Sequence, residues 1–252
     1  MTPTPTRTQT RFLAGLSLLG LAAAAGCGSD DPGQAPAPVP TTVVAAPDPL
    51  LGTPITDSDV LTASMLGLGD LPDGFSSIPD PVRDLGLDPA PDYDSPDESS
   101  TDPAECAAVI APVSEQVAGA ATSAVVRFSG PNFSSIDEDA ASYVGTGTAD
   151  AFAAVQQAWT GCAEFTGTDA DGVSVEYALA GREQPQIGDA SASIRLTTNS
   201  EGFTLISDVV VAVVDSTVVQ IVVSDQSGLE PETVTAVAEA AADRIRSATP
   251  NA

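Results

Sequence analysis

The stretch FTLISDVVVAVVDSTVVQIVVSD, residues 203–225, decides the fold. Its two halves, 203–215 and 217–225, are rich in Val, Ile and Thr, the residues that β-strands favour. The polar pair Asp215-Ser216 lies where the two halves meet, and a connection this short joins antiparallel neighbours. We therefore expect the two halves to form a β-hairpin.

Further strands are expected upstream of this hairpin. GVSVEYALA (172–180) and SASIRLTTN (191–199) have a similar composition and a period of two. ATSAVVRFSG (121–130) is another expected strand, and SYVG (142–145) is a candidate for a short one. Consecutive strands that are joined by tight turns predict an antiparallel sheet.

Two segments have the helical period instead. We expect one helix over residues 148–162, with Thr148 or Asp150 as its capping residue, and a terminal helix over residues 229–248. Trp159 is expected to lie in the core. The apolar stripes are Phe152, Val155, Trp159 and Cys162 in the first helix, and Val234, Val237, Ala241 and Ile245 in the second.

Two shorter helices are expected nearer the N-terminus. Asp57 or Ser58 caps one of them, and Asp102 caps the other, with Pro103 at its first position. Amphipathic helices bury their apolar stripes against a sheet, so the predicted class is α+β in two layers. We expect an antiparallel sheet of about five strands, covered on one face by helices, with one disulfide. The apolar residues of the two short helices are Val60, Leu61, Met65 and Leu66, and Cys106, Val109 and Ile110.

The N-terminal residues predict export. Two Arg and no acidic residue precede the apolar run 12–26, which is shorter than the roughly 20 residues that a membrane-spanning helix needs. This pattern predicts a signal peptide over residues 1–26. The sequence Ala-Ala-Gly-Cys that ends at Cys27 resembles the bacterial lipobox, with Ala24 where a Leu is usual. In that motif the Cys is acylated and becomes the first mature residue. The alternative is an ordinary cleaved signal with a Cys close to the cut.

The Pro/Ala-rich residues that follow, 27–55, show no periodicity and predict a flexible tether. The folded domain is then expected over residues 56–248. Together these features predict a protein anchored to the cell membrane by lipid at Cys27, on the extracytoplasmic face.

With Cys27 lipidated, Cys106 and Cys162 remain. Exported proteins meet an oxidising environment, so this pair predicts a disulfide. The alternative is two buried free thiols.

The charge of the chain narrows its possible partners. It has 35 acidic residues against 8 basic ones, no His, and a net charge of −27. All the basic residues are Arg. Such a field repels phosphates, which excludes nucleic acid as a partner. The codon bias of a high-GC genome, together with the need for solubility, is another explanation of this acidic charge.

The residue types exclude most catalytic chemistry. Without His there is no Ser-His-Asp triad, Cys-His pair or imidazole metal site, and without Lys there is no Schiff base. We expect no catalytic residues, no cofactor and no defined metal site. The segment TDADGVSVE (168–176) has the wrong register for a calcium loop and predicts a hairpin turn. The acidic, Pro-rich segment 76–101 predicts a long mobile loop, where a cation or partner would bind if anywhere.

The order of motifs resembles the extracellular sensor domain of the PknH-type mycobacterial kinases and its stand-alone lipoprotein relatives in actinobacteria. The resemblance rests on LTASMLGLGDLPDGF (61–75), PAEC (103–106), AFAAVQQAWTGC (151–162), the Val-rich hairpin and the Ala-rich last helix. Family members often carry a second Cys pair in the late strands, which this chain lacks. The resemblance implies an antiparallel sheet with helices on one side, a cleft, binding of an extracellular ligand, and no enzyme activity.

These observations favour a non-enzymatic, membrane-anchored ligand-binding or sensor-like module whose ligand or protein partner is unknown. The alternative is a carrier of an apolar ligand such as a lipid or glycolipid, which needs a large cavity between sheet and helices. A hydrolase that uses only carboxylates is the third possibility.

Overall fold

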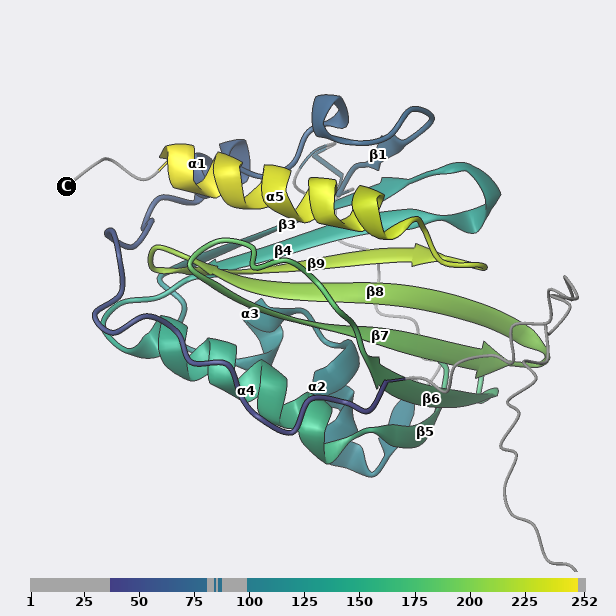
Figure 1. Ribbon diagram of the computed structural model, residues 1–252. Coiled ribbons are helices and arrows are strands. Elements are labelled where there is room, and N and C mark those ends of the chain that lie inside the picture. The colour runs from purple at the N-terminus through teal and green to yellow at the C-terminus, as the bar shows by residue number, and fades with distance from the viewer. Residues whose placement is uncertain (1–36, 81–83, 85, 88–98, 249–252) are drawn as a thin grey trace, which may run out of the picture. The chain divides into compact units, whose positions relative to one another are not determined.

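The computed structural model describes residues 37–80, 84, 86–87 and 99–248 (Figure 1). In this part of the chain, nine strands form one antiparallel sheet in the order β1-β3-β4-β9-β8-β7-β6-β5-β2. The predicted signal peptide and Cys27 lie outside the described residues. The strands are β1 (Ser76–Ile78), β2 (Ser100–Asp102), β3 (Thr122–Ser129), β4 (Ser135–Ser142), β5 (Glu164–Thr168), β6 (Ser174–Gly181), β7 (Ala190–Ser200), β8 (Phe203–Val214) and β9 (Thr217–Asp225).

Helices lie on both faces of this sheet. Figure 1 shows α1 and α5 on one face and α2, α3 and α4 on the other. The helices are α1 (Ser58–Ala63), α2 (Ala107–Ile110), α3 (Val113–Gln116), α4 (Gly147–Gly161) and α5 (Pro231–Ala248), and the 3-10 turns are η1 (Leu68–Asp70), η2 (Ala104–Cys106) and η3 (Pro131–Phe133).

The central hairpin explains why both faces are covered. Strands β8 and β9 pair from Ile206↔Asp225 to Val214↔Thr217, so the predicted hairpin is confirmed. Every residue from Val209 to Val214 is buried, although successive side chains of a strand point to opposite faces. A strand that is apolar on both sides needs a cover on both sides. The expectation of helices on one face only was therefore wrong.

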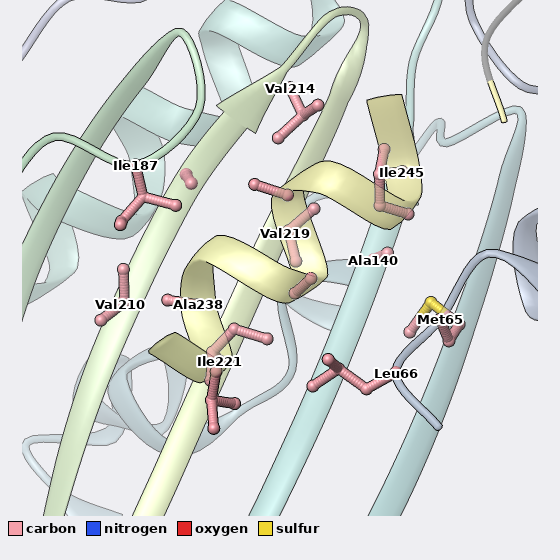
Figure 2. Packing of buried hydrophobic residues seen from close by; sticks show 14 of the residues in the cluster. Met65, Leu66, Ala140, Ile187, Val210, Val214, Val219, Ile221, Ala238 and Ile245 are labelled. Carbon is pink, nitrogen blue, oxygen red and sulfur yellow. The ribbon is translucent and has the colours of Figure 1, made fainter. Parts of the chain in front are cut away.

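The two faces hold separate apolar cores. Figure 2 shows the core under α5, where Ala238 and Ile245 lie over Val210, Val219 and Ile221 of the sheet. The core on the other face gathers around Phe152, Val155 and Trp159 of α4 and includes both Cys106 and Cys162, which form a disulfide.

The prediction of about five strands was too low. The strands expected near 121–130, 172–180 and 191–199 are β3, β6 and β7. Strand β4 was missed because its sequence is acidic, and it ends where the short strand 142–145 was expected. The expected loop 76–101 begins and ends in the short edge strands β1 and β2, and most of its middle lies outside the described residues.

Two predicted helix starts were also wrong. Asp102 belongs to β2, and the helical segment that follows begins with η2 at Ala104. Helix α4 begins at Gly147, and Thr148 Oγ1 donates to the Ser216 carbonyl at 2.8 Å instead of capping the helix. The predicted cap at Asp57 is confirmed, since its side chain accepts from the amides of Asp59 and Val60.

Candidate ligand-binding site

Residues 37–55, here called the strap, run along α4 towards α1 (Figure 1). Their sequence has no helical or strand period, and long-range hydrogen bonds hold them in place. The Gly181 amide donates to the Ala37 carbonyl at 2.9 Å, and the Ile55 amide donates to Ser142 Oγ at 2.9 Å. The predicted tether limits, 27–55, remain a prediction, but these contacts hold the second half of that segment against the sheet and α4.

Helix α4 contributes the middle of this attachment. The Gln156 side chain accepts from the Val44 amide at 2.8 Å and donates to the Val44 carbonyl at 3.1 Å. The Gln156 side chain thus makes the two hydrogen bonds with the Val44 backbone that a neighbouring strand would otherwise make. Three apolar side chains of the strap, Val39, Ala46 and Leu50, pack against the core under α4.

Two glycines allow the strap to approach the sheet closely. A Cβ atom on Gly181 would lie 2.5 Å from the Pro38 carbonyl oxygen, which no side chain tolerates. At the other end, Gly52 has φ +73 and its Cβ would meet the side chain of Asp215 at 2.6 Å. The position of the strap therefore depends on backbone approaches that only glycine permits.

A pocket of about 180 Å³ lies under the strap. Strand β6 pairs with β7 only as far as Gly181↔Ile194, so the first residues of β7 have no partner on that side. The pocket occupies this place, between β7, α4 and the strap. Its lining residues are Pro40, Thr42, Val43 and Val44 of the strap, Gln156, Trp159 and Thr160 of α4, Arg182 and Gln184 after β6, and Ser191, Ala192 and Ser193 of β7.

Arg182 is the charged residue of this lining, and its side chain is only 8% exposed. Its Nε lies 3.2 Å from Oδ1 of Asp208, and its Nη1 donates to Gln184 Oε1. Asp208 already accepts two hydrogen bonds from Arg195, at 2.8 Å and 2.9 Å. Hydrogen bonding to Asp208 raises the pKa of Arg195. Nη2 of Arg182 is buried and has no hydrogen-bond acceptor.

This arrangement can bind a ligand, and it contains no catalytic pair. Neutral polar side chains next to the Trp159 ring can hold a small group that has both a polar and an apolar part. The pocket lining includes no Asp, Glu, Cys or Tyr that could act as an acid, base or nucleophile.

Two buried carboxylates lie elsewhere in the sheet. Glu138 accepts from the Leu66 amide at 2.6 Å on the α5 side, and burial raises its pKa to about 7. Asp139 accepts from the Ser114 amide at 2.9 Å on the α3 side, and burial raises its pKa as well. Because neighbouring residues of β4 point to opposite faces, these two carboxyls cannot act together on one substrate.

The structure brings together the single predicted pair of site residues, Cys106 and Cys162, in a disulfide. At the turn 168–176, Asp169 Oδ1 accepts from the Asp171 and Val173 amides, which is the hairpin turn that was expected. Over the described ranges, no group of three or more His, Cys, Asp or Glu side chains could hold a metal ion. No helix within those ranges is long and apolar enough to cross a membrane.

Sequence reasoning missed Arg182, Asp208 and the strap. A signal for Arg182 did exist. The chain has no Lys and only eight Arg, so each Arg is a candidate for a specific ion pair. The pairing of Arg182 with Asp208 has no local signal, since it joins the end of β6 to β8.

No family model and no curated protein matches this sequence. Among solved structures, the chain is similar to the extracellular domain of PknH from Mycobacterium tuberculosis, with a TM-score of 0.54 and 13% identity over 77% of this chain and 99% of that one. An uncharacterized protein from Mycobacterium smegmatis, the Rv0999 ortholog, matches with a TM-score of 0.38 and 15% identity over 75% of this chain and 98% of that one. At these identities the first similarity is one of fold, and the second is too weak to support an argument. The expected likeness to a PknH sensor domain is thus confirmed for the fold.

Proposed function

We propose that this chain is an extracytoplasmic, lipid-anchored ligand-binding module without catalytic activity. The observation that carries the proposal is the pocket under the strap, which is lined mainly by neutral polar and apolar residues of the strap, α4 and β7. The fold shared with the extracellular domain of PknH is consistent with a sensor-like role.

Anchoring would bring this pocket close to the membrane. The strap begins ten residues after the proposed lipid site at Cys27, and its residues 40–44 form one wall of the pocket. A ligand that contacts this wall also contacts the segment leading to the membrane. Ligand binding would then be coupled to the conformational freedom of the segment that leads to the membrane.

The anchoring part of the proposal is tested by metabolic labelling with an alkyne fatty acid. The wild type should be labelled and should fractionate with membrane, and Cys27→Ala should not be labelled. Equal labelling of both proteins would refute lipidation at Cys27.

The binding part is tested by thermal melting of the mature chain with fractionated small molecules from the culture medium. A ligand present at 100 times its Kd stabilises the fold by about 2.7 kcal/mol, which raises the Tm by several degrees. The control is Ala192→Leu, which fills the pocket from β7. A shift of the same size in wild type and control would place binding elsewhere.

The alternative, a carrier of a lipid or glycolipid, has less support. It needs a large apolar cavity between sheet and helices, and both of these interfaces are occupied by buried side chains. Co-purified lipid in mass spectra of the native protein would favour the carrier.

A further inference from the structure

Another pocket, of about 250 Å³, has its floor on strands β3, β4 and β9. Two cross-strand pairings define this floor, because Arg127 lies opposite Asp137 and Asp139 lies opposite Gln220. Opposite residues share a face, and so do residues two positions apart on one strand, so all four side chains point to the same face of the sheet. Asp139 accepts from the Ser114 amide of α3, which shows that this is the face of α2 and α3 (Figure 1).

Arg127 and Asp137 are accessible on this floor and only loosely paired. Their side chains are 58% and 33% exposed, and Arg127 Nε lies 3.7 Å from Asp137 Oδ1, which is too far for a hydrogen bond. Within the part of the chain that the structure describes, the Arg127 guanidinium donates no hydrogen bond, and Asp137 accepts one, from Ser135 Oγ. An exposed pair of this kind contributes little to stability, so both groups can turn to a ligand at small cost.

Gln220 adds an unused donor at the base of the pocket. The residue is only 7% exposed, and its Oε1 accepts from Gln116 Nε2 at 3.4 Å. Its own Nε2 has no acceptor among the described residues. Asp139 Oδ1 also lacks a partner, but it is fully enclosed and out of reach of a ligand, whereas Gln220 Nε2 is not enclosed in this way.

We propose that this pocket binds a free α-amino acid with an apolar side chain. Such a molecule carries its ammonium and its carboxylate on one carbon atom, and the floor presents an anion and a cation at a similarly short distance. The Arg127 guanidinium and Gln220 Nε2 would donate to the ligand carboxylate, and Asp137 would accept from the ammonium. This pocket shares no lining residue with the pocket under the strap, so the inference and the proposed function stand or fall separately.

The charge of the chain and the walls of the pocket both favour this class of ligand. A net charge of −27 repels a free anion and attracts free cations to the whole surface, whereas a zwitterion has no net charge. Ile110, Val125 and Val222 offer apolar surface beside the charged pair. Pockets for drug-sized ligands begin at about 300 Å³, so this smaller pocket suits a molecule of the size of an amino acid.

The test is an NMR titration of the isotope-labelled mature chain in detergent, followed at the side-chain amide of Gln220, which lies in this pocket. Leucine should shift this signal in a saturable way. Leucinamide lacks the carboxylate and N-acetylleucine lacks the ammonium, so each should bind at least tenfold more weakly than leucine. No saturable shift with leucine, or equal affinity for leucine and either analogue, would overturn the inference.

Variants assign the two charges of the ligand to their partners. Arg127→Gln should weaken leucine binding at least tenfold and leave leucinamide binding nearly unchanged. Asp137→Asn should weaken leucine binding to the same degree and leave N-acetylleucine binding nearly unchanged. The matched control is Arg246→Gln, which removes an arginine that is 44% exposed and pairs with Asp189, and it should bind leucine like the wild type.

The variants can also refute the assignment. An unchanged leucine affinity in either pocket variant, or an equal loss in Arg246→Gln, would show that the two charges do not bind the ligand as proposed. If a pocket variant does not fold, the comparison of leucine with its two analogues in the wild type decides the matter.

Discussion

Replacing Glu138 with Gln should change how the stability of the fold depends on pH. The Glu138 carboxyl is buried in β4, accepts one hydrogen bond from the Leu66 amide, and has no partner for Oε1. Burial is the main cause that raises its pKa from 4.5 to about 7, against the opposing effects of the Leu66 hydrogen bond and the charge of Arg244.

The sign follows from where the proton is held. Between pH 4.5 and 7 the folded chain keeps a proton on Glu138 that the unfolded chain has lost. The stabilisation is therefore complete below pH 4.5 and is lost as the pH rises through about 7. At about 1.4 kcal/mol for each pH unit between these values, the loss is roughly 3 kcal/mol.

The assay is urea unfolding followed by Trp159 fluorescence at a series of pH values from 4 to 8. The wild type should lose roughly 3 kcal/mol more than Glu138→Gln across this range, whatever the absolute stability of the variant. Burial also raises the pKa values of Asp137 and Asp139, but both proteins share these groups. Glu239→Gln, on the exposed side of α5, should behave like the wild type. Equal slopes for wild type and Glu138→Gln would refute the reasoning.

Three further perturbations test other parts of the account. Replacing Cys106 and Cys162 with Ser should lower the free energy of unfolding by about 4 kcal/mol, because the disulfide closes a sequence separation of 56 residues. The Tm measured by calorimetry should fall by roughly 10 °C, and an unchanged Tm would contradict this. Gly181→Ala should detach the strap, since its Cβ would meet the Pro38 carbonyl oxygen, and hydrogen exchange at the Val44 amide should then become faster. The control Gly161→Ala has open space around its Cβ and should leave that exchange rate unchanged. Asp208→Ala should cost about 3 kcal/mol in chemical unfolding, because it leaves the buried Arg182 without a counter-charge; a loss below 1 kcal/mol would show that this ion cluster is not important for stability.

The elements that the sequence predicted well have a pattern that their own residues create. The β8–β9 hairpin, α4 and α5 were predicted because Val-rich runs and apolar stripes are local signals. The same runs also carried the information that both faces of the sheet are covered, since a strand such as Val209–Val214 has no polar side.

The elements that the sequence missed are stabilised by partners far away in the chain. Strand β4 carries Asp137, Glu138 and Asp139, which a strand tolerates only where distant groups such as the Leu66 and Ser114 amides satisfy them. These pairings join residues 25 to 72 positions apart, so no local pattern shows them.

The candidate site shows the same limit. The disulfide was predictable because the predicted export and the cysteine count constrain it. The strap was read as a flexible tether because its Pro/Ala-rich sequence has no period. Its order comes from Gln156, 112 positions away, and from the space left by Gly181.

Native mass spectrometry tests ligand binding under the strap without any assumption about the ligand. The sample is the mature chain, taken from the membranes of the cells that make it. The wild type should carry a noncovalent small-molecule adduct that gentle activation removes, and Ala192→Leu, which fills the pocket, should carry none. A wild type without any adduct, or an adduct with equal occupancy in Ala192→Leu, would contradict a ligand-binding role for this pocket.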